Sequence, residues 1–489
     1  MTIIKFSESY TLPAAIRVVT CEFQAKSDWS VLFFLTLYRI VSSIIFLLGL
    51  PVIALLCLSV AKWREGLDQK LGLPDTDALL RSRLLDLLHR NNDSELQPEQ
   101  LLESKETENI WLHAVSFGEV KTIEPLVYAL QEAFPTHKIC LSTGTQTGQQ
   151  LAQKLFSDRT QNPRLKKDCF VFYYPFDFYF AVKNWFSALK PKFVIVAETE
   201  IWPEFLFQCM QRRVPVFIVN GRLTDRSVSK YRLIKPLMQE ALRAFKGIFV
   251  QSEADQKRFF QIGATEEQVE VLSNMKFDAL PQLQPERLQA LKAELNLKQH
   301  SRVLIAGSTH KGEEELACQL YVALLKRHPN VDLRLIIAPR HLERLNEVED
   351  ACKTKQLQYI KRSDGTNNFD QVLILDTLGE LNLFYGISQI ALLGGTWTNV
   401  GGHNPLEAAL YGIPIFAGPH THKITDLVSQ LEEMRLMHQI SELTVLLDKV
   451  SEIIGSSSTE EVSRQAQQLI KEQMGAVRRS VELIKHYLD

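Results

Sequence analysis

The chain lacks the cysteine patterns that define disulfide scaffolds and zinc sites. Its seven cysteines are scattered, odd in number and include no CxxC pair, which argues against both kinds of site and fits a reducing cytosol. It also lacks an excess of charge of one sign, since 55 Lys and Arg stand against 57 Asp and Glu and the net charge is −2. A near-neutral chain of this size is not a general nucleic-acid binder by composition. Any anion it binds must therefore be held by local basic groups.

The rest of the composition fits a globular protein of several domains. Hydrophobic residues make up 45% and charged residues 23% of the chain, close to the averages for folded proteins. The length of 489 residues predicts roughly two to four domains.

One segment near the start contains no charged side chain. Residues 40–61 read IVSSIIFLLGLPVIALLCLSVA, and a membrane-spanning helix needs about 20 such residues. The flank KWREGLDQK has a mild basic excess and an interfacial Trp63, which places the C-terminal part of the chain in the cytoplasm. A cleavable signal peptide is disfavoured, because the apolar stretch is long and no A-x-A site follows. We predict an anchor over residues 31–62, either single-pass or a monotopic hairpin turned at Gly49–Pro51, and assign no structure to the extension 1–30.

Short apolar runs alternate with amphipathic segments after the polar stretch 91–108. This alternation predicts βαβ units and a parallel sheet. Residues 278–286 interrupt it as a linker, the alternation then restarts, and residues 460–489 are expected to form one or two helices. The predicted strands are Ile110–Val115, Lys138–Ser142, Phe170–Tyr173, Phe193–Ala197, Pro215–Val219, Gly247–Gln251, Val269–Ser273, Val303–Ala306, Leu333–Ala338, Val372–Leu375, Ile387–Leu393 and Ile413–Phe416. The predicted helices of the first half are Gln146–Phe156, Ala181–Leu189, Val228–Ala244 and Glu253–Ile262.

The predicted fold class is therefore α/β, with two Rossmann-like domains at 63–277 and 287–489. The terminal helices could pack back on the first domain. Ligands of open α/β sheets bind at the carboxyl ends of the strands, so two such sheets facing across a cleft can bring two substrates together. GT-B glycosyltransferases and some epimerases share this layout, and fold alone does not choose between them.

Two acidic motifs follow strands of the first half. In SFGE, a strand ends, a tight turn follows and Glu119 begins a helix, where a carboxylate could take a proton from an acceptor hydroxyl. The alternative is that Glu119 only complements the helix dipole. Glu198 and Glu200 close another strand, and the alternation of an extended chain predicts that one of them faces the cleft. Helix capping is the alternative for Glu200.

A basic segment follows the next strand. Five basic residues stand against the single acid Asp225, and they could bind a phosphorylated lipid head group or an anionic membrane surface. The alternative is a solvated helix face. The basic residues are Arg222, Arg226, Lys230, Arg232 and Lys235.

Five motifs after consecutive strands of the second half together indicate a nucleotide site. In GSTH, small residues let backbone N–H groups and Ser308 approach a phosphate at a helix N-terminus. APRH places Arg340 at the next strand end, and DTLGEL and LGGT follow two further strands. In GGHNPLE, Asn404 is the expected helix cap and Pro405 occupies an early helical position. Glu407 is placed to accept ribose hydroxyls, with a capping role as the alternative.

In order along the chain, these motifs resemble those of the 3-deoxy-D-manno-octulosonic acid (Kdo) transferases, which start the inner core of lipopolysaccharide. The resemblance runs from about residue 33 to residue 430. It implies a membrane-bound, inverting GT-B transferase that moves Kdo from CMP-Kdo to the lipid A precursor on the cytoplasmic face of the inner membrane. The blocks that carry it are HAVSFGE, STGTQTG, ETEIWP, NGRLTDRS, QSEAD, SNMKFD, GSTHKGEEE, APRH, DTLGELNLFY and GGTWTNVGGHNPLEAALYGIPI.

The resemblance also implies roles for individual residues. Glu119 would be the general base, and Glu198 and Lys276 would stabilise the transition state, with Glu200 as the other possible match to Glu198. Arg222 and Arg226 are acceptor-binding candidates. Residues that would bind CMP or its phosphate are Ser308, Pro339, Arg340, Gly379, Glu380, Leu381, Asn404, Pro405, Leu406 and Glu407.

No cofactor, essential metal or nucleic-acid partner is implied. The DxD match Asp75–Asp77 lies beside the predicted anchor, outside the α/β halves. Basic groups such as Arg340 and Lys276, together with helix N-termini, are expected to neutralise the departing phosphate. The alternative function is a GT-B transferase that uses another nucleotide sugar and a membrane lipid acceptor.

Overall fold

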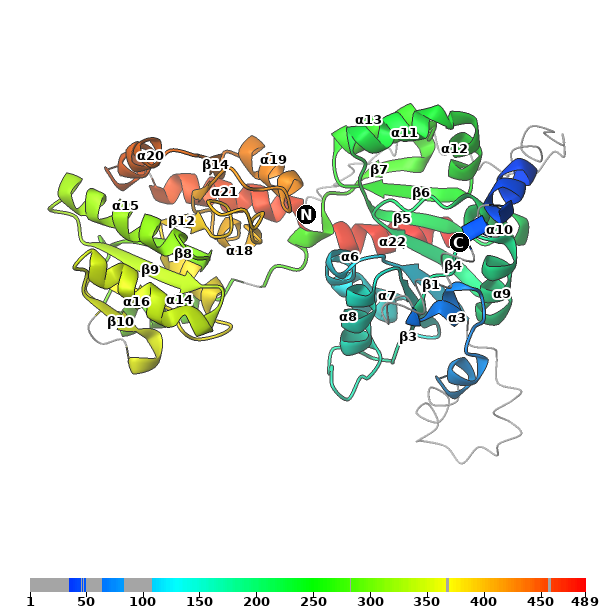
Figure 1. The fold of residues 1–489 in the computed structure, drawn as a ribbon, viewed down its shortest axis with the longest axis horizontal. Helices are drawn as coiled ribbons and strands as arrows, with labels where there is room; N and C mark the ends of the chain where they lie inside the picture. Colours follow the sequence, from blue (N-terminus) through cyan, green and yellow to red (C-terminus); the bar gives the residue numbers. More distant parts are fainter. Residues whose placement is uncertain are drawn as a thin grey trace, which may run out of the picture.

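The computed structural model describes residues 35–44, 46, 48–49, 64–82, 108–281, 283–365, 369–455 and 459–489. These residues form two α/β domains that lie side by side, each built on a seven-stranded sheet (Figure 1). The α/β fold predicted from the alternation of strands and helices is confirmed.

The first sheet has the strand order β3-β2-β1-β4-β5-β6-β7, with every pair of neighbours parallel. Leu112 of β1 is in register with Leu141 of β2 and Ile195 of β4. The strands are almost continuously buried, as expected for a parallel sheet covered on both faces. They are β1 (Asn109–His113), β2 (Lys138–Thr143), β3 (Phe170–Tyr173), β4 (Pro191–Ala197), β5 (Val216–Gly221), β6 (Phe245–Val250) and β7 (Val269–Val271).

Helices connect and cover these strands. The predicted helix Val228–Ala244 is in fact two helices that break at Ile234, because Pro236 lies in the first turn of the second helix and cannot continue the first. The helices of this domain are α3 (Leu67–Lys70), α6 (Phe117–Thr122), α7 (Glu124–Ala133), α8 (Gln146–Phe156), α9 (Tyr179–Leu189), α10 (Pro203–Arg212), α11 (Asp225–Leu233), α12 (Lys235–Leu242) and α13 (Glu253–Ile262).

The second sheet has the order β10-β11-β9-β8-β12-β13-β14 and is also parallel. The prediction missed its short edge strands β10 and β14, and the predicted strand Ile387–Leu393 begins too early, because Ile387 ends a helix. The strands are β8 (Arg302–Thr309), β9 (Leu333–Pro339), β10 (Tyr359–Lys361), β11 (Val372–Ile374), β12 (Ile390–Leu393), β13 (Ile415–Ala417) and β14 (Met437–Gln439). The helices of the second half are α14 (Pro285–Glu294), α15 (Glu313–Arg327), α16 (Leu345–Thr354), α17 (Leu381–Ile387), α18 (Leu406–Ala409), α19 (Thr425–Glu433), α20 (Leu443–Gly455), α21 (Thr459–Gln473) and α22 (Ala476–Leu488).

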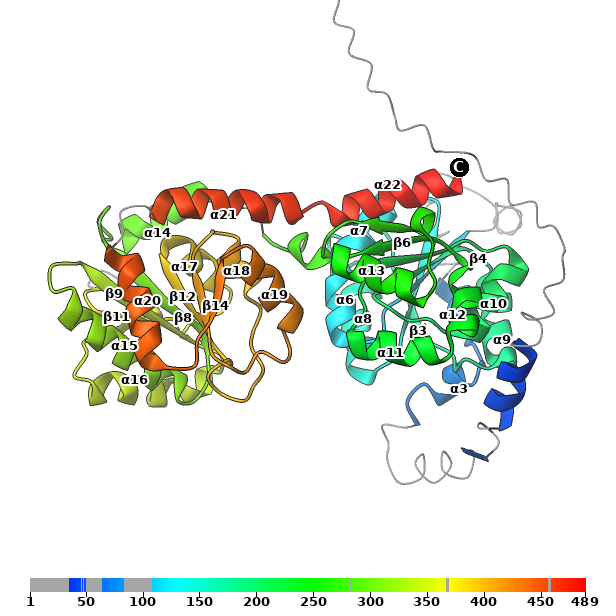
Figure 2. The ribbon, with the colours of Figure 1, turned by 90° about the horizontal axis from the view of Figure 1, so that it is seen from above.

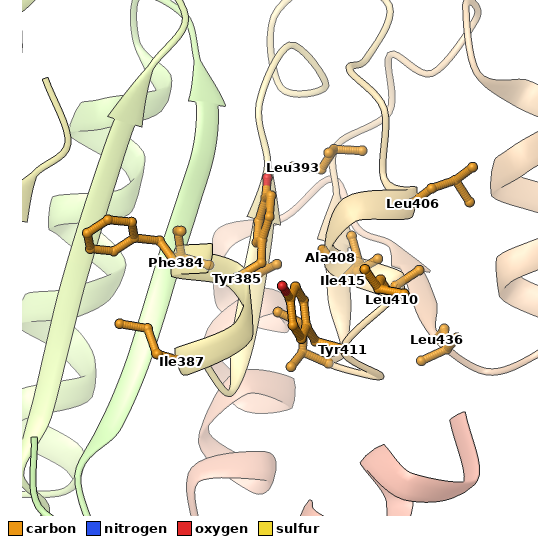
Figure 3. Close-up of a cluster of buried hydrophobic side chains, with 14 of the residues drawn as sticks. Phe384, Tyr385, Ile387, Leu393, Leu406, Ala408, Leu410, Tyr411, Ile415 and Leu436 are labelled. Carbon is orange, nitrogen blue, oxygen red and sulfur yellow. The ribbon is translucent and has the colours of Figure 1, made fainter. Parts of the chain in front are cut away.

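Side chains of α17 and α18 pack into the core of the second domain (Figure 3). Tyr385 lies so close to β8 that a Cβ at Gly307 would stand 1.9 Å from the tyrosine hydroxyl. The glycine of the GSTH motif therefore permits a close helix-to-strand contact beneath the strand end.

The last two helices cross from one domain to the other (Figure 2). The α21 helix contacts α18 in the second domain, whereas α22 contacts α7, β5 and β6 in the first. Asp278 accepts hydrogen bonds from the backbone N–H groups of Gly475 and Val477 at the start of α22. Ile484 of α22 is fully buried in the first domain's core, and burial of such a side chain stabilises by about 1.5–3 kcal/mol.

The predicted anchor is only partly covered, because residues 31–34, 45, 47 and 50–63 lie outside the described residues, as does the extension 1–30. Residues 35–44 are helical. Tyr38 donates a hydrogen bond of 2.6 Å to Asp177, and Arg39 pairs with Glu204 at 2.7 Å. Across the described ranges, no helix combines the length and apolarity that a membrane span requires.

Candidate active site

Each sheet has one point where the strand order reverses. In the first sheet the chain moves outward from β1 to β3 and returns to place β4 beside β1, and in the second sheet β12 returns beside β8 in the same way. Ligands of open α/β sheets bind outside the carboxyl ends of the strands at such switch points. The predicted site residues cluster at these two places.

Glu119 lies at the switch point of the first sheet, in the first turn of α6. Ser116 caps that helix, and its hydroxyl donates to Glu119 Oε1 at 2.8 Å, while the Val115 N–H donates to Oε2 at 2.7 Å. Burial raises the pKa of Glu119, and these hydrogen bonds and the charge of Arg222 oppose that rise. Glu119 therefore does interact with the start of its own helix. Its carboxylate oxygens still have lone pairs that can accept a hydrogen bond from a substrate.

Glu198 and Glu200 follow β4, directly beside the strand that precedes Glu119. We expected one of them to face the cleft, but both line the same cavity. Glu198 has a left-handed backbone with φ of 56°, which ends the strict alternation of an extended chain and lets both side chains turn to one side. Glu200 does not cap α10, whose N-cap is Trp202.

The charge of Glu119 acts on both of the other carboxylates. Burial raises the pKa of Glu198, and the charge of Glu119 raises it further. Burial raises the pKa of Glu200 to about 7, again with a contribution from Glu119. Closely spaced carboxylates with shifted pKa values are typical of sites that move protons. The cavity has a volume of about 270 Å³ and is lined by Glu119, Glu198, Thr199, Glu200, Arg222, Leu223, Thr224, Ser227 and Tyr231.

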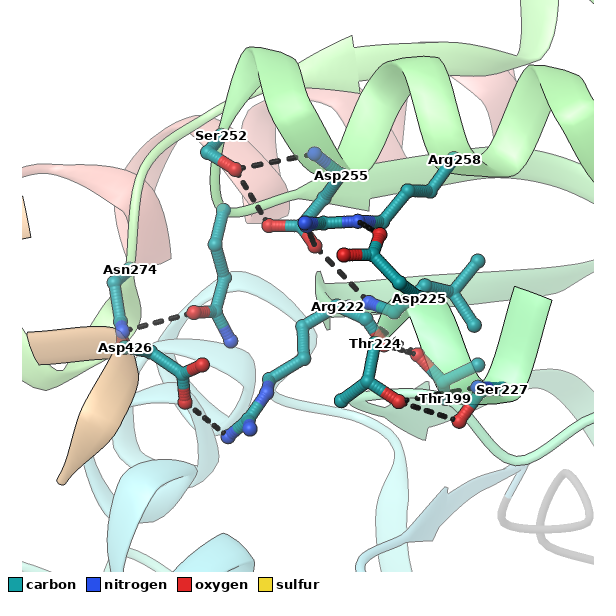
Figure 4. A network of polar contacts seen from close by, with 12 residues as sticks. Thr199, Arg222, Thr224, Asp225, Ser227, Ser252, Asp255, Arg258, Asn274 and Asp426 are labelled. Atoms are coloured by element: carbon teal, nitrogen blue, oxygen red, sulfur yellow. Dashed lines mark hydrogen bonds and ion pairs between the residues drawn. The ribbon is translucent and has the colours of Figure 1, made fainter. Parts of the chain in front are cut away.

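Arg222 extends across the cavity from the loop after β5 and meets Asp426 of the second domain at 2.6 Å (Figure 4). Asp426 begins α19, which follows β13. The ion pair therefore joins the carboxyl edges of the two sheets. Arg226 is the second residue of α11, is exposed and does not line the cavity.

Lys276 lies in the short 3-10 helix Met275–Phe277, and its charge lowers the pKa of Glu198. A set of buried amides positions this helix. Asn220 accepts from the Met275 N–H at 2.9 Å, and Asn274 accepts from the Lys276 N–H at 3.0 Å and donates to Gln251. Sequence reasoning missed these amides, although Asn220 stands next to Arg222 in a motif that we had noted.

At the second switch point, a buried carboxylate binds backbone N–H groups of the LGGT loop and of the GSTH motif. The Glu313 carboxylate accepts hydrogen bonds from the backbone N–H groups of Gly395, Thr396 and Trp397 at 2.7–3.0 Å, and from that of His310 at 2.9 Å. Glu313 is almost fully buried. The His310 N–H, at the end of the GSTH motif, is therefore already engaged by Glu313.

Ser308 and Arg340 do lie at neighbouring strand ends. Ser308 is in β8 with a left-handed φ of 56°, and Arg340 follows β9 with an exposed side chain. The Arg340 N–H donates to the Thr309 carbonyl at 3.0 Å, which holds the end of β9 against β8. Pro339, the last residue of β9, is buried.

The DTLGEL and GGHNPLE motifs lie on the same edge. Glu380 pairs with Arg362 at 3.0 Å and also accepts from Thr377, so its carboxylate is held by protein partners, while Gly379 is exposed with φ of 85° and Leu381 begins α17. Asn404 accepts from the Leu406 N–H at 3.2 Å, but the N-cap of α18 is Pro405 and not Asn404. Burial raises the pKa of Glu407, in the first turn of this helix.

In the part of the chain that the structure describes, no three His, Cys, Asp or Glu side chains gather as a metal site would require. Asp75 of the DxD match accepts from the Ala78 N–H at 2.9 Å.

A family model and curated relatives point to one family. A family model described as 3-deoxy-D-manno-octulosonic-acid transferase (kdotransferase) matches residues 87–279. The 3-deoxy-D-manno-octulosonic acid transferase of Haemophilus influenzae is 34% identical over 387 residues, covering 78% of this chain and 88% of that protein. The protein of the same name from Bordetella pertussis is 27% identical and covers 78% of this chain and 87% of its own length. Among solved structures, the C-terminal CMP-Kdo binding domain of WaaA from Acinetobacter baumannii is 26% identical, with a TM-score of 0.35, over 38% of this chain and 97% of that domain.

Proposed function

The chain belongs to the 3-deoxy-D-manno-octulosonic acid (Kdo) transferase family and is a glycosyltransferase, and from this premise we propose that it moves Kdo from CMP-Kdo to the lipid A precursor in lipopolysaccharide biosynthesis. The observation that carries the proposal is the gathering of Glu119, Glu198, Glu200 and Arg222 around one cavity at the switch point of the first sheet. A proton-accepting group beside a bound hydroxyl is what transfer to an alcohol needs.

Glu119 is the proposed general base. The acceptor hydroxyl forms a bond to the anomeric carbon of Kdo as its proton passes to the Glu119 carboxylate. The bond from that carbon to the phosphate oxygen breaks, and its electron pair leaves with CMP. Burial raises the pKa of Glu119 and makes it a stronger base than an exposed carboxylate, and such a base contributes roughly 10²–10⁴-fold to the rate.

Charged groups around Glu119 are proposed to stabilise the transition state. The anomeric carbon of Kdo gains positive charge as CMP leaves, and the buried Glu198 carboxylate beside Glu119 would stabilise that charge. Lys276 and Arg340 would neutralise the departing phosphate, and the Ser308 hydroxyl would donate a hydrogen bond to it. This set of protein cations supports transfer without an essential metal, and activity that survives EDTA treatment is the expected result.

The acceptor is proposed to bind in the cavity of the first domain. Arg222 lines that cavity and Arg226 lies one turn further along on the protein surface, so both could meet a phosphate of the lipid head group. The hydroxyls of Thr224, Ser227 and Tyr231, which also line the cavity, could bind a glucosamine ring.

The site of action is proposed to be the cytoplasmic face of the inner membrane, with the apolar segment 40–61 as the anchor. The flanking basic excess supports this orientation. Fractionation of cells that express the full chain and a variant lacking residues 1–62 would test the anchor, because the variant is expected to leave the membrane fraction.

The test of the reaction is mass spectrometry of products formed from tetraacylated lipid A precursor and CMP-Kdo made in situ. The detergent-solubilised full chain is expected to yield Kdo-bearing products, and Glu119→Gln is expected to slow their formation by roughly 10²-fold or more. Glu124→Gln is the matched control, because Glu124 lies in the next helix and pairs with Lys121 instead of lining the cavity.

CMP binding is measured on the same preparations. Arg340→Ala is expected to weaken it, whereas Glu119→Gln leaves it intact, and an unchanged CMP affinity in Arg340→Ala would remove the proposed role of that residue. Normal transfer by Glu119→Gln would show that the base is wrongly assigned. Binding of UDP in preference to CMP would favour the alternative of another nucleotide sugar.

A further inference from the structure

Two histidines meet at the switch point of the second sheet. His310 follows β8, and His403 belongs to the loop that follows β12. Their Nε2 atoms are 2.8 Å apart and their rings are parallel within 3°. The two imidazoles therefore bridge the crevice in which an open α/β sheet binds its ligand.

The short Nε2-to-Nε2 distance fixes how protons are distributed over the pair. Contact at 2.8 Å requires that one ring donates an N–H and the other accepts with a lone pair. A neutral pair then presents one further N–H on its two Nδ1 atoms, and a pair that has gained one proton presents two. Uptake of a proton therefore increases both the positive charge and the number of donors that face a ligand.

The surroundings keep the empty pair neutral. Burial, together with the charges of His310, Arg340, Lys423 and His341, lowers the pKa of His403 to about 4. Burial also lowers the pKa of His310, where Arg340 and Arg344 act in the same direction and Glu313 opposes them. An anionic ligand beside the pair would reverse this balance, because a nearby negative charge favours the protonated imidazole.

Glu313 engages four backbone donors near the pair. Glu313 accepts the N–H groups of Gly395, Thr396, Trp397 and His310. These four N–H groups are therefore not available to a phosphate, whereas the imidazole pair can both donate hydrogen bonds to it and change its charge to match it.

We propose that the His310–His403 pair binds the phosphate of the nucleotide donor, takes up one proton as that phosphate binds, and returns it to the phosphate as the sugar leaves. The inference rests on the proposed function for the identity of the donor. When the bond between the anomeric carbon and the phosphate oxygen breaks, its electron pair stays on that oxygen. The proton moves from an imidazole N–H of the pair to the phosphate, which leaves as the monoanion, and the pair returns to its neutral form.

The first test counts protons during CMP binding to the full chain. Calorimetric titrations at neutral pH in two buffers of different ionisation enthalpy give the number of protons exchanged. We expect an uptake of about one proton per CMP, and none for cytidine, which lacks the phosphate. This count does not depend on any variant being folded. CMP binding without proton uptake would overturn the inference and leave the proposed function intact.

The second test compares histidine variants. His403→Gln and His310→Gln retain a polar side chain that cannot take up the proton, and each is expected to abolish the uptake and slow Kdo transfer by roughly 10²-fold or more. His438→Gln is the control, because His438 is a half-buried imidazole on β14, packed against Phe416 and away from the switch point. Unchanged uptake and turnover in both pair variants would refute the inference.

One further outcome would bear on both the proposed function and the role of the histidine pair. If the full chain neither binds CMP nor transfers Kdo, the proposed function fails and the role of the pair in binding that donor fails with it. The two failures are therefore distinguishable by whether CMP binds.

Discussion

We expect Glu313→Gln to destabilise the second domain strongly, although it replaces only one carboxylate oxygen with an amide nitrogen. The carboxylate accepts four backbone hydrogen bonds, two on each oxygen, from Gly395 and His310 and from Thr396 and Trp397. An amide has one accepting oxygen and one donating nitrogen. In Glu313→Gln, one pair of buried N–H groups would therefore face another donor.

The magnitude follows from the two donors left without an acceptor. Each buried unsatisfied N–H costs about 1–3 kcal/mol, so the variant is expected to lose about 2–6 kcal/mol. A typical domain is stable by about 5–15 kcal/mol, so this loss is a large fraction of the total. At about 2–4 °C per kcal/mol for a domain of this size, the unfolding temperature of the second domain should fall by about 4–24 °C.

The assay is thermal unfolding of the full chain in detergent, together with hydrogen exchange at the amides of residues 394–397. Glu315→Gln is the matched control, because Glu315 lies in the same first turn of α15 with an exposed side chain. It removes the same charge from the helix N-terminus, at a cost of about 0.3–1 kcal/mol. Unfolding of Glu313→Gln within about 0.5 kcal/mol of that control, a difference typical of neutral surface changes, would refute the reasoning.

Three further predictions concern the first domain. The charge of Arg222 lowers the pKa of Glu119, so Arg222→Gln should move the acid limb of the kcat/KM profile to higher pH, whereas Arg222→Lys should not; a limb that stays in place would contradict this. Ile484→Ala should destabilise the first domain by about 2–5 kcal/mol in thermal unfolding, while the exposed Glu482→Ala on the same helix should not, and equal effects would show that α22 is not part of that core. Burial raises the pKa of Asp177 to about 6, so the folded state holds this proton more tightly than the unfolded chain, and stability falls as pH rises from about 4 to about 6. Measured as the free energy of unfolding at a series of pH values, this fall is expected to be about 3 kcal/mol smaller in Asp177→Asn. An equal pH dependence of stability in the variant and the unmodified protein would contradict the role of Asp177.

Much of the fold could be read from local patterns. The helices Gln146–Phe156 and Glu253–Ile262 and the strand Phe170–Tyr173 occur with the predicted bounds, because their apolar spacing and flanking caps are local properties. The edge strands Tyr359–Lys361 and Met437–Gln439 were missed. They are three residues long, and pairing with a neighbouring strand defines them better than their own sequence does.

The functional site also has features that the sequence predicts and features that only the folded structure reveals. The sequence alone determined that Glu119, Glu198 and Arg340 follow strands, because a strand end and a turn are visible locally and parallel strands present their carboxyl ends at one edge. It could not show that Glu200 shares the cavity of Glu198, since the left-handed backbone at Glu198 is held in place by a hydrogen bond to Val219 of the neighbouring strand.

Tertiary structure alone decided which groups are free to act. The sequence showed Gly395 and Thr396 at the end of a strand, but only the packing of α15 against that loop brings Glu313, 82 positions away, onto the Gly395 donor. His310 and His403 are 93 positions apart and touch because β8 and β12 are neighbours. Hydrogen bonds between such distant residues are set by the order of strands in the sheet, and local propensity contains no record of that order.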